Sequence, residues 1–338
     1  MPDAPPVLVT GAAGFIGFHL CRALLAQGRA VIGVDDLNAY YDVALKEARL
    51  RLLQAHAGFS FHRLDLGEGP ATEALFTQAR PGVVIHLAAQ AGVRWSVEHP
   101  HAYIHSNLVA WANVLEGCRQ TGVGHLLFAS SSSVYGDSGS ARLTEDDDAG
   151  HPVSLYAATK RSGELMGHAY ADLHGLPVTA MRFFTVYGPW GRPDMALFLF
   201  TEKILAGEPI QVFNRGEMYR GFTYVDDAVA GVLALMDPPP APDPSYDPRA
   251  PRASRSRAPF RAWNIGSDQP VKLLRLIELL EEALGVKAKM ELRPMQLGDV
   301  VSTCADVSRL REERGVGPRV GIEEGVRRFV DWYRGHHG

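Results

Sequence analysis

A glycine-rich turn between an apolar run and a helical stretch is the feature that most constrains the fold. The run Val7-Leu-Val-Thr10 leads into Gly11-Ala-Ala-Gly14-Phe15-Ile16-Gly17, and an amphipathic pattern continues to about Gln27. Glycines at this spacing let the backbone turn tightly and approach a pyrophosphate, which the free N–H groups at a helix start can bind. The motif predicts the first strand, turn and helix of a Rossmann-like fold, with a cofactor at Gly11, Gly14, Phe15, Ile16 and Gly17.

Carboxylate and small side chains at later strand ends indicate which dinucleotide is bound. Asp35 ends the second apolar run, where its carboxylate accepts hydrogen bonds from an adenosine ribose and would repel a 2′-phosphate. NAD is therefore favoured over NADP. Asp65 and Leu66 follow the third run and are expected to border the adenine, and Leu87-Ala88-Ala89 follow the fourth and allow close approach of the cofactor. The alternative is a glycine-rich turn with a capping aspartate.

Alternation of short apolar runs with longer helical stretches extends from residue 7 to about residue 183. It predicts an α/β fold, a Rossmann-like doubly wound parallel sheet. The expected strands are Val7 to Thr10, Ala30 to Asp35, Phe59 to Leu64, Val83 to Leu87, His125 to Ser130 and Val178 to Phe183. We expect an NAD-binding domain at 1–184 and a smaller α/β substrate-binding region at 185–338, with amphipathic helices at 272–284 and 322–332. Residues 237–262, rich in Pro, Arg and Ser, predict a flexible insert or a tolerated surface loop.

Charge and cysteine usage exclude several classes of protein. Lys and Arg number 34 and Asp and Glu number 38, a net charge of −4, which argues against a nucleic-acid partner or an anionic membrane surface. No window approaches the roughly 18 apolar residues of a spanning helix. Cys21, Cys118 and Cys304 lie far apart and have no metal-ligand spacing. We therefore expect no disulfide framework, no metal site and a cytoplasmic location.

A tyrosine and a lysine four residues apart form the candidate catalytic pair. Tyr156 and Lys160 share one face of a helical stretch, and Ser130-Ser131-Ser132-Ser133-Val-Tyr-Gly precedes them at a strand end. A nearby ammonium and an oxidised nicotinamide would stabilise a phenolate, and Lys160 would also hold the cofactor ribose. A serine hydroxyl would form a hydrogen bond with the substrate oxygen that Tyr156 deprotonates. An isolated Tyr-x-x-x-Lys is often surface decoration, but here it follows a nucleotide motif.

These motifs together resemble the extended short-chain dehydrogenase/reductases, in their sugar-nucleotide epimerase/dehydratase branch. Longer runs are similar to UDP-glucuronate 4-epimerases. They are Asp36-Leu-Asn38-Ala-Tyr-Tyr-Asp, His86-Leu-Ala-Ala-Gln90-Ala-Gly-Val-Arg94, Arg182-Phe-Phe-Thr-Val-Tyr-Gly-Pro-Trp-Gly-Arg-Pro-Asp-Met195 and Pro294-Met-Gln-Leu-Gly-Asp299. The resemblance covers nearly the whole chain.

The resemblance implies a reaction and an assembly. NAD stays bound, Tyr156 takes the proton of the sugar 4-hydroxyl, and a transient 4-keto sugar is reduced on its other face, which inverts C4. Ser131 matches the catalytic Ser/Thr of the family, and Asn38 joins the cofactor-binding residues. The stretches 99–121 and 155–174 match helices that form a homodimer. From their own pattern, these stretches equally suit helices that cover the sheet within one subunit.

Residues around the sugar indicate the substrate. A 4-keto uronic acid is a β-keto acid that loses CO2 readily, so an epimerase must hold its carboxylate; Ser132, Ser133, Thr185 and Arg192 are the candidates. Whether Arg192 contacts carboxylate or diphosphate stays open. Related dehydratases carry an Asp-Glu pair at 132–133 and related decarboxylases a Glu at 133, so serines favour carboxylate retention.

The resemblance also suggests ligands for the nucleotide. Arg220 resembles a diphosphate ligand and Asp299 a ribose ligand, while Phe213 either stacks near uracil or is buried. The predicted function is NAD-dependent epimerisation of UDP-glucuronate to UDP-galacturonate. The alternatives are a UDP-hexose 4-epimerase, a UDP-glucuronate decarboxylase and a non-enzymatic NAD-sensing protein.

Overall fold

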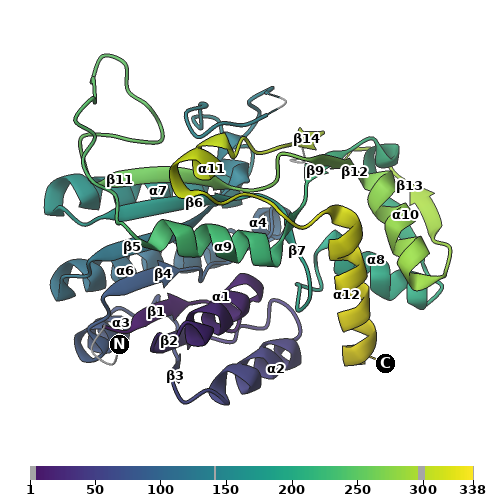
Figure 1. Ribbon diagram of the computed structural model, residues 1–338, viewed down its shortest axis with the longest axis horizontal. Helices are drawn as coiled ribbons and strands as arrows, with labels where there is room; N and C mark the ends of the chain where they lie inside the picture. Colours follow the sequence, from purple (N-terminus) through teal and green to yellow (C-terminus); the bar gives the residue numbers. More distant parts are fainter. Residues whose placement is uncertain (1–4, 141, 296–300, 338) are drawn as a thin grey trace.

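A seven-stranded parallel sheet lies at the centre of the described chain, in the order β11-β6-β5-β4-β1-β2-β3 (Figure 1). The computed structural model describes residues 5–140, 142–295 and 301–337. Inner strands such as β1 and β6 are buried along their whole length, as expected where helices cover both faces. The strands are β1 (Val7–Thr10), β2 (Val31–Asp35), β3 (Phe59–Arg63), β4 (Val83–His86), β5 (His125–Ser131), β6 (Val178–Phe183) and β11 (Phe260–Ile265).

Helices cover the two faces of this sheet and confirm the doubly wound α/β class. On one face α1 (Phe15–Ala26), α2 (Val43–Gln54) and α9 (Val225–Met236) share a core with residues such as Val9 and Met181. On the other, α3 (Gly69–Ala79), α6 (Ala110–Thr121) and α7 (Leu155–His174) pack around Leu8 and Phe128. Alternate residues of one strand thus serve opposite cores.

The central sheet contains one strand more than the six that were predicted. All six predicted strands are present, with ends that differ by at most one residue. The seventh, β11, was not predicted, and its residues 260–262 lie in the segment assigned to the insert. It pairs in parallel with β6, with Phe260 opposite Val178, and buries Trp263 and Ile265. The central sheet therefore takes a strand from beyond residue 184.

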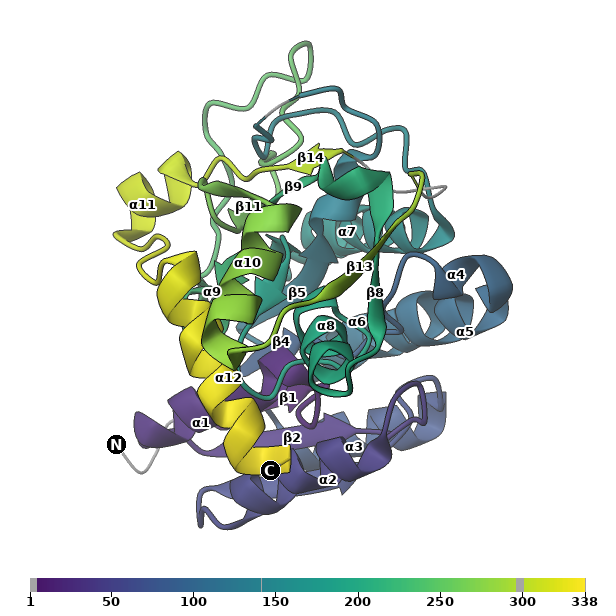
Figure 2. The same cartoon turned by 90° about the vertical axis from the view of Figure 1, so that its right-hand side faces the viewer.

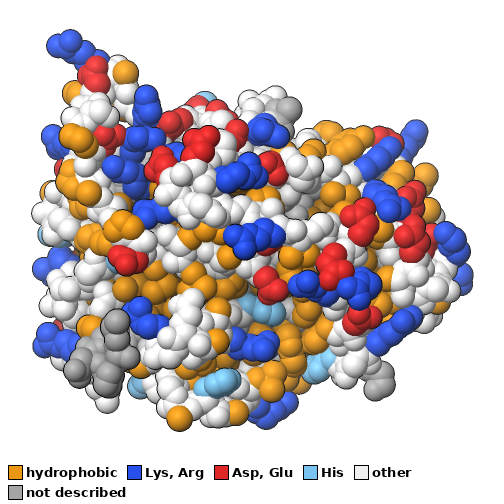
Figure 3. Space-filling model, in the orientation of Figure 1, with side chains coloured by type: hydrophobic (Ala, Val, Ile, Leu, Met, Phe, Trp, Pro, Cys, Tyr) orange, Lys and Arg blue, Asp and Glu red, His pale blue; other side chains and the backbone are white. Residues whose placement is uncertain are grey.

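The rest of the segment at 237–262 projects from the molecule but is anchored on its return to the sheet. It forms the loop that rises between α9 and β11 in Figure 1, and basic side chains gather along it in Figure 3. Ser254 is fully buried and donates to a carboxylate oxygen of Asp146, and the Ser256 hydroxyl lies 2.8 Å from Nε2 of His168. These contacts hold the end of the loop that precedes β11.

Small sheets and four helices make up most of the remaining C-terminal part, beside the carboxyl ends of the central strands (Figure 2). Strands β12, β9 and β14 form one sheet, and β10 pairs with β7 and β13 with β8. The bounds are β7 (Val186–Tyr187), α8 (Ala196–Leu205), β8 (Pro209–Val212), η3 (Phe213–Gly216), β9 (Tyr219–Gly221), β10 (Thr223–Tyr224), β12 (Pro270–Lys272), α10 (Leu273–Leu284), β13 (Lys289–Leu292), β14 (Ser302–Thr303), α11 (Ser308–Arg314) and α12 (Ile322–His337). Both predicted amphipathic helices are present, as α10 and a longer α12.

The predicted helical stretch at 99–121 is a continuous run of different helix types. It comprises α5 (Pro100–Ile104), a π-helical turn η1 (His105–Val109) and α6, and it follows the short α4 (Trp95–Glu98). The Nε1 of Trp111 on α6 donates to the carbonyl of Gly163 on α7, so the two long helices lie side by side. None of the helices in the described ranges has the length and apolar character needed to cross a membrane.

Candidate active site

A cavity of about 730 Å³ lies at the carboxyl ends of the parallel strands. This is where ligands bind in open α/β sheets. The residues predicted for the cofactor all line it: Gly11, Gly14, Phe15, Ile16, Gly17, Asp35, Asn38, Asp65, Leu66, Leu87, Ala88, Ala89 and Lys160. Besides Lys160, which was also predicted as catalytic, six of the residues predicted for catalysis or substrate line it: Ser131, Ser132, Ser133, Tyr156, Thr185 and Arg192.

The glycine turn has the shape that a pyrophosphate requires. Gly11 has a φ of +69°, and a Cβ there would lie 2.8 Å from the backbone nitrogen of Ala88. At Gly17 a Cβ would lie 2.0 Å from the Gly11 carbonyl oxygen, so the turn tolerates no side chain there. Helix α1 begins after Gly14 without a side-chain cap, so its first N–H groups remain available for an anion. The residues present fit NAD.

Asp35 and Asn38 are held in place beside this turn. The Asp35 carboxylate accepts from the backbone N–H groups of Ala13 (3.1 Å) and Leu37 (2.9 Å), and burial raises its pKa. Lys46, which the sequence analysis did not single out, donates from Nζ to the carbonyl (2.7 Å) and side-chain oxygen (2.9 Å) of Asn38. In the sequence, Lys46 is marked only by its position eight residues after Asn38.

The candidate catalytic pair lies in the first two turns of α7. Ser154 caps this helix by accepting from the N–H of Ala157 at 3.1 Å. Lys160 is buried and donates from Nζ to the carbonyl of Ala129 at 2.7 Å, and burial lowers its pKa to about 7. Lys160 therefore connects the helix to the end of β5. Because its pKa is close to neutral, its protonation state depends on the charges around it.

The pKa of Tyr156 lies above the ordinary value of a phenol, because burial outweighs two groups that favour its ionised form. Burial raises the pKa of this phenol, while a hydrogen bond with Ser131 and the positive charge of Arg192 act in the opposite direction. The role of Lys160 in stabilising the phenolate stays a prediction. The hydroxyl partner of Tyr156 is Ser131, the residue that the resemblance marked.

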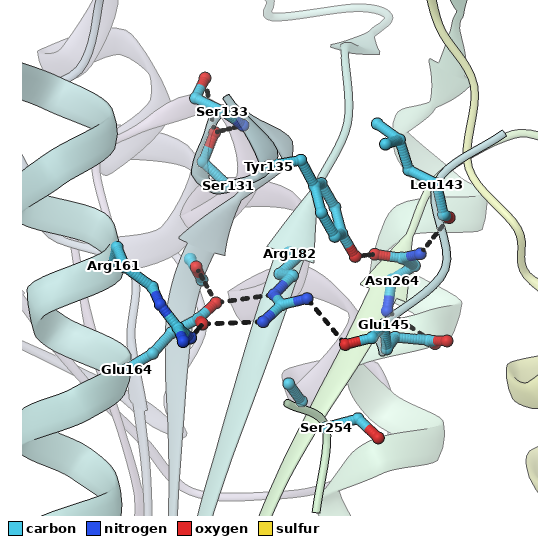
Figure 4. Close-up of polar contacts among 12 residues, drawn as sticks. Ser131, Ser133, Tyr135, Leu143, Glu145, Arg161, Glu164, Arg182, Ser254 and Asn264 are labelled. Atoms are coloured by element: carbon cyan, nitrogen blue, oxygen red, sulfur yellow. Dashed lines mark hydrogen bonds and ion pairs between the residues drawn. The ribbon is translucent and has the colours of Figure 1, made fainter. Parts of the chain in front are cut away.

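The serine run turns sharply at the end of β5, so that its hydroxyls face one another (Figure 4). The short helix η2 (Ser132–Tyr135) begins there, and the Ser131 hydroxyl accepts from the N–H of Ser133 and donates to its Oγ, both at 3.2 Å. Residues 131–133 therefore present hydroxyl groups to the cavity, and none of these three residues is a carboxylic acid.

A buried charge network lies directly behind the serine run (Figure 4). The Glu164 carboxylate, on α7, accepts from Nε and Nη2 of Arg182 at 2.8 and 2.9 Å and from the Ser130 hydroxyl at 2.6 Å. Arg161 adds a fourth donor at 2.8 Å. Burial opposes ionisation, but the guanidinium of Arg182 keeps the pKa of Glu164 low. The network joins α7, β5 and β6 beneath the site.

Arg192 is held at the cavity by an acidic neighbour. Its Nε and Nη2 donate to the two carboxylate oxygens of Asp194, and the Tyr40 hydroxyl also donates to Asp194 at 3.0 Å. Burial opposes the charge of Asp194, but Arg192 keeps its pKa low. Nη1 of Arg192 takes no part in this pair. Tyr40 and Asp194 were not predicted, although both stand in the motifs quoted above.

Two of the three residues predicted for the nucleotide, Phe213 and Arg220, do not line the cavity formed by the described residues. Phe213 lies beneath the guanidinium of Arg94, 5.3 Å from ring centre to Cζ, and Arg94 itself lines the cavity. Arg220 donates from Nη1 to the carbonyls of Tyr219 (2.9 Å) and Val301 (3.1 Å). Asp299 falls outside the described residues.

His86 and Asn107 are two buried polar residues near the catalytic pair. Nδ1 of His86 lies 2.8 Å from Oγ1 of Thr10, and burial lowers the pKa of His86 to about 3, so it is a neutral core residue rather than an acid or base. Asn107, which was not predicted, accepts from the N–H of Gln90 (2.8 Å) and donates to Thr159 (3.0 Å). It joins the π-helical turn to α7.

Comparisons with known proteins agree with this architecture. Residues 7–246 match the family model described as the NAD dependent epimerase/dehydratase family. The chain is 47% identical to a probable UDP-glucuronate 4-epimerase of Rhizobium meliloti, over 96% of each chain.

Two solved structures share the fold. The UDP-glucuronic acid 4-epimerase of Bacillus cereus, in complex with UDP-glucuronic acid and NAD, has a TM-score of 0.86 at 31% identity over 98% of this chain and 99% of that chain. A UDP-glucose 4-epimerase of Thermotoga maritima, with UDP-glucose, has a TM-score of 0.85 at 30% identity over 98% of this chain and 100% of that one. The predicted resemblance to UDP-glucuronate 4-epimerases is confirmed, and the chain belongs to the NAD dependent epimerase/dehydratase family.

Proposed function

We propose that this protein is a UDP-glucuronate 4-epimerase, an isomerase that uses bound NAD to convert UDP-glucuronate to UDP-galacturonate with the carboxylate retained. One observation carries the proposal: a tyrosine paired with Ser131, a serine run and Arg192 surround the same cavity as the glycine turn. The fold is equally similar to a UDP-glucose epimerase, but the 47% identity is to a relative named for the uronate.

Tyr156 is the proton acceptor in this reaction. Ser131 and Arg192 favour its phenolate against the effect of burial, and this phenolate would take the proton of the sugar 4-hydroxyl, become the neutral phenol, and later return the proton. Ser131 orients the same oxygen. NAD, when bound, supplies the hydride acceptor for C4, with Gly11, Gly14 and Gly17 at its pyrophosphate, and Asp35 and Lys160 at its riboses.

Serine and arginine side chains restrain the carboxylate of the 4-keto intermediate. CO2 leaves when the bond to the carboxylate aligns with the carbonyl π system, so fixed hydrogen bonds in another orientation prevent the loss. Ser132, Ser133 and Thr185 supply neutral donors at the cavity, and Nη1 of Arg192, which is not used by Asp194, would donate to the anionic substrate. Position 133 is a serine, whereas related decarboxylases carry a glutamate there, so decarboxylase activity is disfavoured.

The two parts of the chain are proposed to bind different ligands. Arg220, Asp299 and Phe213 bind the UDP moiety from the 185–338 region, while residues 1–184 hold NAD and the catalytic pair. Arg94, stacked on Phe213 and lining the cavity, connects the two.

Incubation of the purified protein with UDP-glucuronate, without added NAD, tests the function. We expect a product of unchanged mass with galacturonate stereochemistry, resolved by chromatography and mass spectrometry. A matched Tyr156→Phe variant keeps the ring but lacks the proton, so it should retain NAD and lose activity by about 10²- to 10⁴-fold. A product lighter by CO2 would instead indicate a decarboxylase. Turnover of UDP-glucose alone would indicate a hexose epimerase, and NAD binding without turnover of any nucleotide sugar a sensing protein.

The active form is proposed to be a cytoplasmic homodimer. Apolar side chains are exposed on the neighbouring helices α5, η1 and α7, among them Ile104, Val109 and Leu165. A second copy of the same surface would cover them. The three cysteines are buried and unpaired, which suits a reducing compartment.

A further inference from the structure

We propose that Arg49 is a positioning residue that fastens the Arg192 loop (residues 188–195) to the glycine turn (residues 11–17). The inference rests on the proposed function for its chemical consequence, but the connection itself is a property of the chain. Arg49 belongs to α2, lies outside the cavity lining and is completely buried. It was not singled out by its sequence context.

The guanidinium of Arg49 contacts three separate segments at once. Nη1 donates to the carbonyl of Ala13 at 3.0 Å and to the Tyr41 hydroxyl at 2.8 Å. Nη2 donates to the carbonyls of Trp190 at 2.6 Å and Gly191 at 3.2 Å. One rigid, planar group thus bridges the middle of the glycine turn and the residues directly before Arg192.

This arrangement is unusual for a buried cation. Within the described residues, Arg49 has neutral oxygens as its hydrogen-bond partners and forms no ion pair, and its Nε has no partner. Burial lowers its pKa, and the nearby Tyr41 and Asp35 oppose this effect. Removing such a charge from water is costly unless every bond is well made. The planar guanidinium of Arg49 therefore restricts the relative positions of its four acceptor oxygens. The single ammonium group of a lysine cannot contact all four in the same way.

Other contacts fix the Arg192 loop on the same side. Nε2 of His19, on α1, lies 2.8 Å from the carbonyl of Pro189. The Trp190 ring packs against Phe18 on α1 and against Trp332 and His336 on α12. Trp190 has a φ of +62°, a left-handed conformation that a bulky residue keeps only when its surroundings impose it. The hydrogen bonds from Arg49 are part of that restraint.

The connection links both halves of the proposed reaction. Ala13 donates to Asp35, the proposed ribose ligand, and accepts from Arg49. The other arm of Arg49 ends one residue before Arg192. Cofactor binding at the glycine turn and orientation of Arg192 toward the substrate anion are therefore coupled through one side chain.

Hydrogen exchange measured by mass spectrometry tests the connection without reliance on activity. In Arg49→Met we expect the amides of Gly191 and Met195, which bond within the Arg192 loop, to exchange about tenfold faster than in the wild type. Arg49→Lys should fall between the two. Leu53→Ala, also fully buried one turn along α2, is the control for simple loss of stability. It should lower the thermal midpoint without selective exchange in this loop.

Steady-state kinetics with UDP-glucuronate test the consequence. Arg49→Met should raise KM by about tenfold and increase the share of turnovers that lose CO2, while Leu53→Ala keeps both within about twofold of the wild type. Exchange and kinetics in Arg49→Met that match Leu53→Ala would overturn the inference. An inactive wild type would refute the proposed function alone, because the exchange experiment would still decide whether Arg49 couples the loops.

Discussion

Lys160 shows how one residue can serve the reaction at the expense of the fold. Its ammonium is buried and has one hydrogen bond to a described residue, from Nζ to the Ala129 carbonyl. Burial disfavours the charged form and lowers the pKa of Lys160 to about 7, from the 10.5 of an unperturbed lysine. Lys160 also lines the cavity proposed for the cofactor. Such a residue is retained for function rather than for stability.

Substitution Lys160→Met should stabilise the cofactor-free protein while it abolishes turnover. Between about pH 7 and about pH 10.5 the unfolded chain binds the lysine proton and the folded chain does not, so wild-type stability rises with pH across this window. The variant lacks this rise and should be more stable near pH 7 by on the order of 3 kcal/mol. Urea denaturation of both proteins at several pH values measures the difference. Identical pH slopes would contradict the prediction.

At the scale of elements, α7 owes its position to contacts with two strands. Lys160 binds the end of β5, and Glu164, one turn further along, binds Arg182 on β6 (Figure 4). Both side chains of the Glu164–Arg182 pair are at most 1% exposed. Tyr156, Lys160 and Glu164 recur every four residues, so one face of the helix carries both the chemistry and its anchor.

Removing the charge of Glu164 should therefore weaken the fold strongly. In Glu164→Gln the buried guanidinium loses its counter-charge, and we expect a loss of about 3–5 kcal/mol in the free energy of unfolding. Arg161→Ala is the matched control, because Arg161 contacts the same carboxylate but is partly exposed; it should cost less than about 1 kcal/mol. Chemical denaturation measures both. Equal losses in the two variants would show that burial does not govern this network.

The same elements show what local sequence pattern predicts and what it misses. Apolar runs and helical period predicted β1 to β6 and α7, because the local sequence of each carries the strand or helix pattern. Strand β11 was missed since it follows a Pro- and Arg-rich segment and is recognisable only by its pairing with β6. The sequence motifs identified most of the residues that line the cavity. The partners of Arg49 and Asp194 lie up to 154 residues away and depend on how the layers pack, which no local pattern encodes.

For the whole molecule, the proposed homodimer rests on the surface of the helices beside the site. Residues 99–121 and 155–174 do cover the sheet within one subunit, as the alternative reading held, yet their outer side remains apolar. Val109 is 43% exposed and Leu165 is 57% exposed. Exposed apolar side chains on neighbouring helices favour burial against a second copy, in which each helix pair meets its equivalent. The site residues Tyr156 and Lys160 lie on the opposite side of the same helix, so dimerisation would stiffen their support.

Charged substitutions on this surface should separate the protomers. We expect Val109→Glu combined with Leu165→Glu to convert the dimer into a monomer of 36.9 kDa, because a desolvated carboxylate without a partner opposes an apolar interface. Leu292→Glu, at a comparably exposed apolar residue on β13, is the control and should leave the dimer intact. Size-exclusion chromatography with light scattering gives the mass of each. A wild type that elutes as a monomer would remove the homodimer from the proposal, whereas a double variant that stays dimeric would move the interface to another face.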